Sequence, residues 1–229
     1  MPRTARASVG GVCYHVLNRG NDRREDFFKD GDYDAFLKAI GHACVEIPME
    51  VFGYCLMPNH FHLVLRPRED GDLSRWMHWL LNAHVRRYHK HHGRSGHLWQ
   101  GRFKAFPIEE DEHLLTVLRY VERNPVRAKL VRRAERWLWS SAPFWKAEPA
   151  GERPSWLADP PIPRGKDWLA RVNAALTAAE LATVRKSVER GTPLGSPTWQ
   201  QATAIRLGLE STLRARGRPR KLKELPEEK

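Results

Sequence analysis

Two histidines that are one residue apart, His60 and His62, are the side chains in this sequence best placed to hold one metal ion together. They follow Pro58-Asn59 within a run of β-forming residues from 51 to 65, a pattern that predicts two strands joined by a short turn. Because alternate side chains of a strand point to the same face, both imidazoles should project to one side of a sheet. An exposed edge strand with two solvated histidines would show the same pattern, so a functional interpretation needs a second element.

Tyr120 and Asn124 form that second element. Leucines and valines between 114 and 121 have the spacing of an amphipathic helix, with Tyr120 off the apolar stripe and Asn124 one turn later on the same side. Pro125 disfavours helical dihedral angles at Asn124, so we expect a distorted last turn. A phenol beside a divalent ion held by the two histidines could attack a phosphodiester, because the ion would polarise and orient the phosphate. The product would be a phosphotyrosine, whose ester bond lets a second hydroxyl rejoin the strand.

The elements that must position these groups alternate along the chain. Besides the paired strands, periodicity and turn residues predict strands at 12–17 and 101–108, and helices at 33–47, at 72–92 and from 109 onward. Asp32 is the expected N-cap of the first helix. The order β-α-β-β-α-β-α predicts an α+β fold of the ferredoxin-like split βαβ type. We expect helices to cover one face of its antiparallel sheet and the other face to be free to carry a site.

The charge of the chain favours a polyanionic partner. Its 229 residues include 39 Lys and Arg against 27 Asp and Glu, a net charge of +12, and nucleic acid is the commonest partner of such proteins, although ribosomal and membrane-surface proteins share the excess. No apolar run approaches the about 20 residues of a membrane span, and no secretion signal is evident, so we expect a cytoplasmic protein without a membrane partner. Cys13, Cys44 and Cys55 lack paired spacing and are expected to be reduced thiols.

Composition divides the chain into four parts. Residues 1–145 hold the α+β domain, and residues 146–175 are proline-rich, which is typical of a stiff linker. Residues 176–213 predict two short helices around a Thr-Pro-Leu-Gly turn, compatible with a DNA-binding helix-turn-helix and equally with an unrelated helical hairpin. Residues 214–229 form a basic tail centred on Arg-Gly-Arg-Pro, similar to an AT-hook that binds the minor groove of A·T-rich duplex DNA. A disordered tail that adds only non-specific affinity is an equal alternative.

Basic residues interleaved with aromatic ones suit single-stranded nucleic acid, because Arg and Lys pair with phosphates while bases stack on rings. A solvated helix end next to core aromatics would have a similar composition. The predicted DNA-binding residues are Arg86, Arg87, Lys90, Arg94, Arg102, Lys104, Arg216, Arg218 and Arg220.

Three motifs, in this order, resemble the single-tyrosine HUH (IS200-like) transposases and, among them, the REP-associated tyrosine transposases. The motifs are Pro58-Asn59-His60-Phe61-His62, Trp99-Gln100-Gly101-Arg102-Phe103 and Tyr120-Val121-Glu122-Arg123-Asn124-Pro125-Val126-Arg127-Ala128, and the resemblance extends over residues 10–141. It implies that His60 and His62 are metal ligands, that Tyr120 is the nucleophile and that Asn124 is a third ligand or active-site contact. It also implies Mg²⁺- or Mn²⁺-dependent cleavage of single-stranded DNA beside hairpins of palindromic repeats, through a 5′-phosphotyrosine.

Several alternatives stay open at this point. Imidazole ligands suit Mn²⁺ better than Mg²⁺, which prefers oxygen, so we expect Mn²⁺ to support activity at least as well as Mg²⁺. A non-catalytic hairpin-binding regulator or architectural protein is the main alternative function, and an RNA-processing protein of the same fold is a third. Because the family includes dimers that exchange the tyrosine helix, a dimer is one outcome. The Pro125 break and the C-terminal extension favour a monomer acting in cis.

Overall fold

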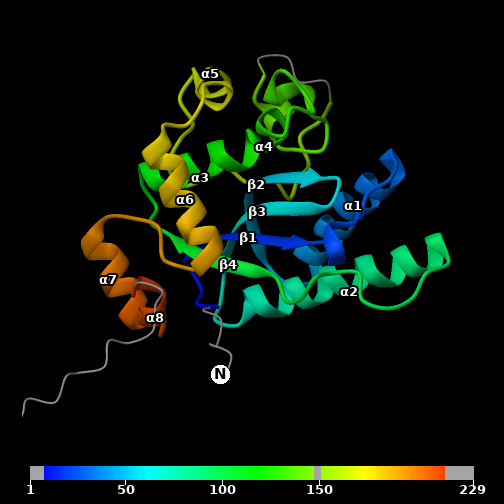
Figure 1. Ribbon diagram of the computed structural model, residues 1–229, viewed down its shortest axis with the longest axis horizontal. Helices are drawn as coiled ribbons and strands as arrows, with labels where there is room; N and C mark the ends of the chain where they lie inside the picture. Colours follow the sequence, from blue (N-terminus) through cyan, green and yellow to red (C-terminus); the bar gives the residue numbers. More distant parts are fainter. Residues whose placement is uncertain (1–7, 147–150, 215–229) are drawn as a thin grey trace, which may run out of the picture.

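A four-stranded antiparallel sheet lies at the centre of the protein, with helices on both sides (Figure 1). The computed structural model describes residues 8–146 and 151–214. The strands are β1 (Cys13–Arg19), β2 (Met49–Met57), β3 (His60–Pro67) and β4 (Lys104–Ile108), in the spatial order β2-β3-β1-β4. This is the order of the ferredoxin-like fold, so the predicted fold class is confirmed. The Pro58-Asn59 turn joins β2 and β3 as predicted.

Two long helices cover the first face of the sheet. They are α1 (Asp30–Glu46) and α2 (Asp72–His92), which bury Phe36 and Trp76 against alternate residues of β1 and β3 such as Val16 and Leu63. The predicted bounds of α2 are correct.

The predicted N-cap of α1 is wrong, because Lys29 occupies that position. Asp32 lies in the first turn instead. There its carboxylate accepts hydrogen bonds from the backbone N–H groups of Phe28 (3.1 Å) and Lys29 (3.3 Å) and so satisfies donors that the helix leaves free.

The second face of the sheet is also covered, which corrects the expectation of a free face. Helices α3 (Glu112–Glu122) and α6 (Ala178–Arg190) pack here, α3 on β2 and β3, and α6 on β4 and α3. The strand residues that point to this side include Cys55, Val64 and Phe106, which are fully buried or nearly so. Strands that are apolar on both faces need a cover on both faces.

A short helix follows α3 after a bend. Arg123 has φ −81° and ψ −7° and connects α3 to α4 (Asn124–Arg127), in whose first turn Pro125 lies. The expected distortion of the helix end is therefore confirmed, because the proline ring cannot continue the hydrogen-bond ladder of α3. Short 3₁₀ helices occur at η1 (Asn21–Arg23), η2 (Ala134–Arg136) and η3 (Ala142–Trp145).

The proline-rich segment does not extend away from the domain in its described part. Leu157 forms a bridge to Val51 of β2, and the side chain of Arg164 donates to the carbonyl of Phe52. The segment leads into α5 (Trp168–Asn173), then into α6, α7 (Pro197–Arg206) and α8 (Glu210–Leu213). Thr177 and Glu180 form the predicted capping box of α6. That α6 and α7 bind duplex DNA stays a prediction.

The basic tail, with Arg216, Arg218 and Arg220, lies outside the described residues. Within residues 8–146 and 151–214, no helix has both the length and the apolar composition that crossing a membrane requires. All three cysteines are free thiols, and burial raises the pKa of the Cys44 thiol to about 11.

Candidate active site

Strand β3 presents the two predicted histidines to the second face of the sheet. In the register of the sheet, His60 is opposite Arg19 and His62 is opposite Leu17, and both alternate with core residues that point to the first face. The ring centroids of the two histidines are 5.1 Å apart. His62 is buried and His60 is partly exposed, so the pair lies at an accessible edge of the core.

Helix α3 brings Tyr120 to these histidines within the same chain. The centroid of the Tyr120 ring is 5.8 Å from that of His62, and the two rings are almost perpendicular, at 89°. The ring is largely buried, with 6% of its surface exposed. Residues that are separated by some sixty positions in the sequence thus meet on one face of the sheet, as the motif pattern predicts for the tyrosine.

Asn124 lies one turn beyond Tyr120 and is buried, but its side chain is partly engaged. Its Oδ1 accepts a hydrogen bond from Nη2 of Arg127 at 3.0 Å, and its Nδ2 has no hydrogen-bond partner among the described residues. An amide oxygen has two lone pairs, so Oδ1 retains one for a ligand, and a half-turn of the amide would exchange the two atoms. Its predicted role as a metal ligand or active-site contact therefore stays a prediction.

A third histidine, His15, completes the buried part of the site, and sequence analysis did not single it out. It lies on β1, with Nε2 2.9 Å from Nδ1 of His62, and the two rings stack with centroids 5.0 Å apart. It is fully buried, and its Nδ1 has no partner in the described part of the chain. The signal in the sequence is a lone histidine in the middle of the otherwise apolar strand 12–17.

These contacts leave one nitrogen of His60 and one of His62 available. Nδ1 of His60 lies 2.7 Å from Oδ1 of Asn59, an acceptor, so this nitrogen carries the proton, and Nδ1 of His62 is engaged with His15. Burial, reinforced by the nearby charges of Arg19 and Arg127, lowers the pKa of His60 to about 4. Burial also lowers the pKa of His62 well below its ordinary value.

Both imidazoles are therefore neutral at pH 7, which is the form that binds metals. With Nε2 as the free atom on each ring, the two histidines fit a divalent cation.

Arg127 is a second residue that sequence analysis did not single out. Its guanidinium carbon lies 4.5 Å from the centre of the Tyr120 ring, and Nη2 is 3.3 Å from the phenol oxygen. It belongs to the third motif and follows Tyr120 by seven residues, which is about two helical turns, so helical spacing places it on the same side as Tyr120. A cation at this position would stabilise negative charge on the phenol oxygen.

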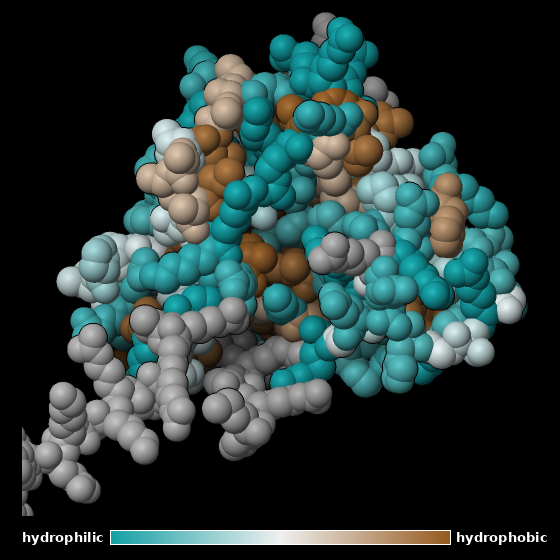
Figure 2. All heavy atoms as spheres, in the orientation of Figure 1, coloured by the Kyte–Doolittle hydropathy of each residue, from teal (hydrophilic) through white to brown (hydrophobic). Residues whose placement is uncertain are grey.

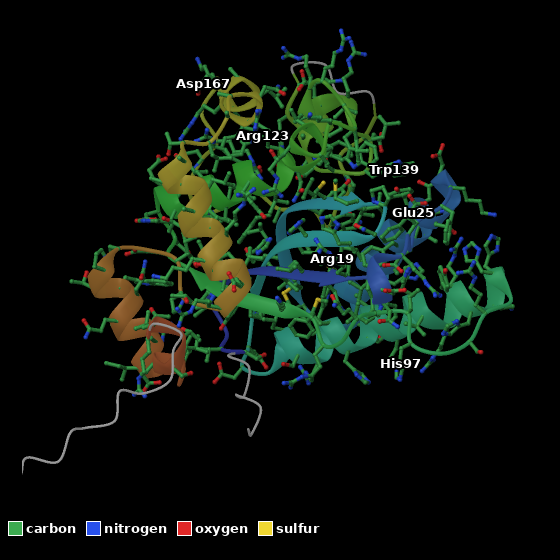
Figure 3. All side chains as sticks on the ribbon, viewed as in Figure 1. Arg19, Glu25, His97, Arg123, Trp139 and Asp167 are labelled. Atoms are coloured by element: carbon green, nitrogen blue, oxygen red, sulfur yellow. The ribbon has the colours of Figure 1, made fainter. Side chains whose placement is uncertain are left out.

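Basic side chains surround the site unevenly. Figure 3 shows Arg19 at the end of β1 and Arg123 near the junction of α3 and α4. A cavity of about 250 Å³ beside Arg19 is also lined by Arg102, Lys104 and Val188 of α6, so the predicted DNA-binding residues Arg102 and Lys104 lie on the second face of the sheet, where the histidines are. Figure 2 shows apolar surface at the bottom of a hollow beside α6, with hydrophilic surface around it.

The other predicted basic residues lie on or just after α2, in the layer that covers the first face. They do not join the histidines: Arg87 donates to Gly31 (3.0 Å) and to Asp32 (3.5 Å), and Arg94 donates to the hydroxyl of Tyr88 (3.4 Å). DNA binding by this group, Arg86, Arg87, Lys90 and Arg94, stays a prediction.

Two further groups offer closely spaced metal-ligand atoms within the described residues. One is Asp32, His91 and His92, where α1 meets α2, and the other is Glu109, Asp111 and His113, before α3. In the first group, Oδ1 of Asp32 already pairs with His92 (3.3 Å) and Arg87 (3.5 Å). The positive charge of Arg87 opposes a cation there, and neither group contacts the tyrosine.

Comparison with known proteins agrees with the motifs. Residues 8–124, which are 117 of the 229, match the model of the family described as Transposase IS200 like. A Haemophilus influenzae protein named as a REP-associated tyrosine transposase is 28% identical over 142 residues, which cover 58% of this chain and 80% of the relative.

Two solved structures are similar to this protein. The structure of a REP-associated tyrosine transposase bound to a REP hairpin has a TM-score of 0.51 and 22% identity, covering 62% of this chain and 82% of that one. That likeness shows the fold. A protein of Deinococcus radiodurans described as a transposase has a TM-score of 0.39 and 17% identity, covering 56% of this chain and 92% of that one.

Proposed function

Because the chain belongs to the IS200-like transposase family, we propose that it is a metal-dependent endonuclease and strand transferase for single-stranded DNA, with Tyr120 as the nucleophile. The observation that carries this proposal is the position of the Tyr120 ring, 5.8 Å from His62 and in contact with Arg127. A protein that only binds DNA has no need of a phenol, two neutral imidazoles and an arginine at one place.

The chemistry follows from these groups. The Tyr120 oxygen forms a bond to phosphorus while the bond from phosphorus to the 3′ oxygen breaks, which leaves a 5′-phosphotyrosine and a 3′-hydroxyl. The phenol proton leaves to water, and the departing 3′ oxygen takes up a proton. Arg127 stabilises the charge that develops on the phenol oxygen and the phosphate. His60 and His62, with Asn124 as a third contact, would hold Mg²⁺ or Mn²⁺, which polarises the phosphate when bound.

Hairpins of palindromic repeats are the proposed substrate, since the solved relative is bound to a REP hairpin. The second face of the sheet also carries basic residues that are suited to bind the phosphates of the single strand leading into the site. They are Arg19, Arg102 and Lys104. One chain brings its own tyrosine to its own histidines, so we propose that a monomer acts in cis.

A covalent trap tests the proposal. Wild type and Tyr120→Phe are incubated with a DNA hairpin that carries single-stranded flanks and a label at its 3′ end, the end that stays on the protein in a 5′-phosphotyrosine. The reactions contain Mg²⁺ or Mn²⁺ and are separated under denaturing conditions. The wild type should form a labelled covalent complex, at least as fast in Mn²⁺, whereas Tyr120→Phe should form none and bind the hairpin with unchanged affinity.

Three results count against this proposal. A covalent complex with the phenylalanine variant would exclude Tyr120 as the nucleophile. Hairpin binding without any cleavage in either metal would leave a non-catalytic hairpin-binding protein. Preferential cleavage of the matching RNA hairpin would indicate an RNA-processing enzyme.

A further inference from the structure

A small cavity opens directly beside Tyr120. Its volume is about 140 Å³, and it is lined by Tyr120, Arg123, Arg127, Ala175, Leu176 and Leu181. We propose that this cavity binds the nucleobase next to the scissile phosphate, so that it sets which base is accepted at the cleavage site. This inference rests on the proposed function, because it needs a phosphodiester at Tyr120.

The two walls of the cavity differ in chemistry. Leu176 and Leu181 form an apolar wall, although neither is fully buried. Tyr120 and Arg127 form the polar part of the lining, and Arg127 is exposed to solvent while it contacts the phenol oxygen. A nucleotide has the same division, because its base has flat apolar faces and its phosphate is an anion. A base between the leucines and a phosphate at Arg127 would satisfy both walls.

The size of the cavity fits one base. A water molecule occupies about 30 Å³ in the liquid, so the cavity has room for roughly five waters. That is enough for a planar ring. Since Tyr120 itself lines the cavity, a base inside it belongs to a nucleotide that adjoins the attacked phosphorus.

The apolar wall is held in a fixed position against α3. Arg119 donates to the carbonyl of Arg171 (3.1 Å), and Arg123 donates to the carbonyls of Val172 (3.2 Å) and Asn173. Arg119 of α3 and Arg123, which directly follows α3, thus bind the end of α5, just before Leu176. This wall lies beyond residues 8–124, which match the family model, so the base preference is a property of the C-terminal extension.

Abasic substrates test the proposal directly. The cleavage position is first mapped on a hairpin with which the wild type forms the covalent complex, and an abasic site is then placed on either side of it. We expect one of the two substitutions to slow formation of the complex about tenfold, because stacking of one base contributes about 1–3 kcal/mol. In Leu181→Trp, whose larger side chain fills the cavity, the intact and abasic hairpins should react within about twofold of each other.

Leu138→Trp is the matched control, because Leu138 is 64% exposed and does not line the cavity. It should keep the tenfold difference. Equal rates of the wild type on the intact and on both abasic hairpins would overturn the base pocket while leaving the nuclease in place. The absence of any covalent complex on the intact hairpin would instead refute the proposed function.

A second measurement does not depend on the folding of a variant. Two hairpins carry the fluorescent base 2-aminopurine, one at the nucleotide that the abasic experiment identifies and the other several nucleotides away. Each hairpin is bound to the wild-type protein without a divalent metal. The fluorescence should change on binding only at the first position. An equal change at both positions would show that the base does not enter a pocket.

Discussion

Tyr120 and Glu122 are two residues apart on α3, yet their surroundings are opposite in kind. Glu122 is fully buried, and its Oε1 accepts hydrogen bonds from Ser141 and from the indole of Trp145, both at 2.7 Å. Its Oε2 accepts from the indole of Trp168 at 2.8 Å. On the Tyr120 side, buried polar atoms of His15 and Asn124 have no partner within residues 8–146 and 151–214.

The difference indicates that Glu122 is a structural anchor and that the Tyr120 side is a binding site. A buried carboxylate with every oxygen paired, and with Arg164 3.9 Å away, holds the C-terminal extension to α3. Buried polar atoms without partners cost folding free energy, and proteins keep them where a ligand supplies the missing contact. One side of the helix end therefore serves stability, and the other is organised for binding.

The largest effect is expected when the anchor is broken. Glu122→Ala should lower the free energy of unfolding by about 3–5 kcal/mol, because it leaves Arg164 and three donors buried without their acceptor. Urea denaturation of the full chain measures this. Glu112→Ala is the control on the same helix, since its ion pair with Arg171 is exposed and should contribute about 0–1 kcal/mol. Equal losses in both variants would mean that Glu122 is not an anchor.

On the site side, Arg127→Ala should leave the fold intact and impair chemistry. Its side chain is exposed, so unfolding should be little changed, while the rate of covalent complex formation should fall by about 100-fold, as it does when a donor to developing charge is removed. Arg132→Ala, at another exposed arginine, is the control for general loss of positive charge. A similar loss in both variants would point to simple electrostatic attraction of DNA.

A smaller effect is expected at the buried histidine. His15→Phe removes the partner of His62 Nδ1, so the affinity for Mn²⁺ should weaken by about 10–100-fold, because such contacts fix the orientation of a metal-binding imidazole. Calorimetric titration of the protein with Mn²⁺ measures it without DNA. His42→Phe on the exposed side of α1 should bind Mn²⁺ as the wild type does. Unchanged affinity in His15→Phe would show that His62 orients itself.

Asp26 can be compared with Glu122, because both carboxyl groups are buried. Neither oxygen of Asp26 has a hydrogen-bond partner among the described residues, whereas both oxygens of Glu122 do. Burial raises the pKa of Asp26 to about 8. The folded state therefore holds its proton where the unfolded state releases it, so stability should be complete below about pH 4 and decline as pH rises towards 8.

The expected decline between pH 5 and pH 7 is about 2–3 kcal/mol. Asp26→Asn carries no titrating proton at this position, so its unfolding free energy should lack this part of the pH dependence. Parallel urea denaturation of both proteins at the two pH values compares them. Identical pH profiles would mean that Asp26 finds partners in solution.

Local sequence patterns were sufficient to predict many of the strands and helices of this protein and the direction of their key side chains. Alternation and the Pro58-Asn59 turn placed His60 and His62 on one face, and periodicity placed Tyr120 on a helix that ends before Pro125. These features depend on residues that are near in sequence, where backbone geometry decides which way a side chain points. That the second face of the sheet is covered was not predictable in this way, because part of its cover is α6, which lies more than a hundred residues after the β2–β3 turn.

The sequence by itself determined the order of elements, the histidine pair and the identity of the nucleophile candidate. Only the tertiary structure decided that His15 lies against His62 and that Leu181 forms a wall beside Tyr120. The physical reason is that turns and periodicity are local properties of the chain. Distances between side chains on different elements depend on how whole faces pack, and no single segment encodes that packing.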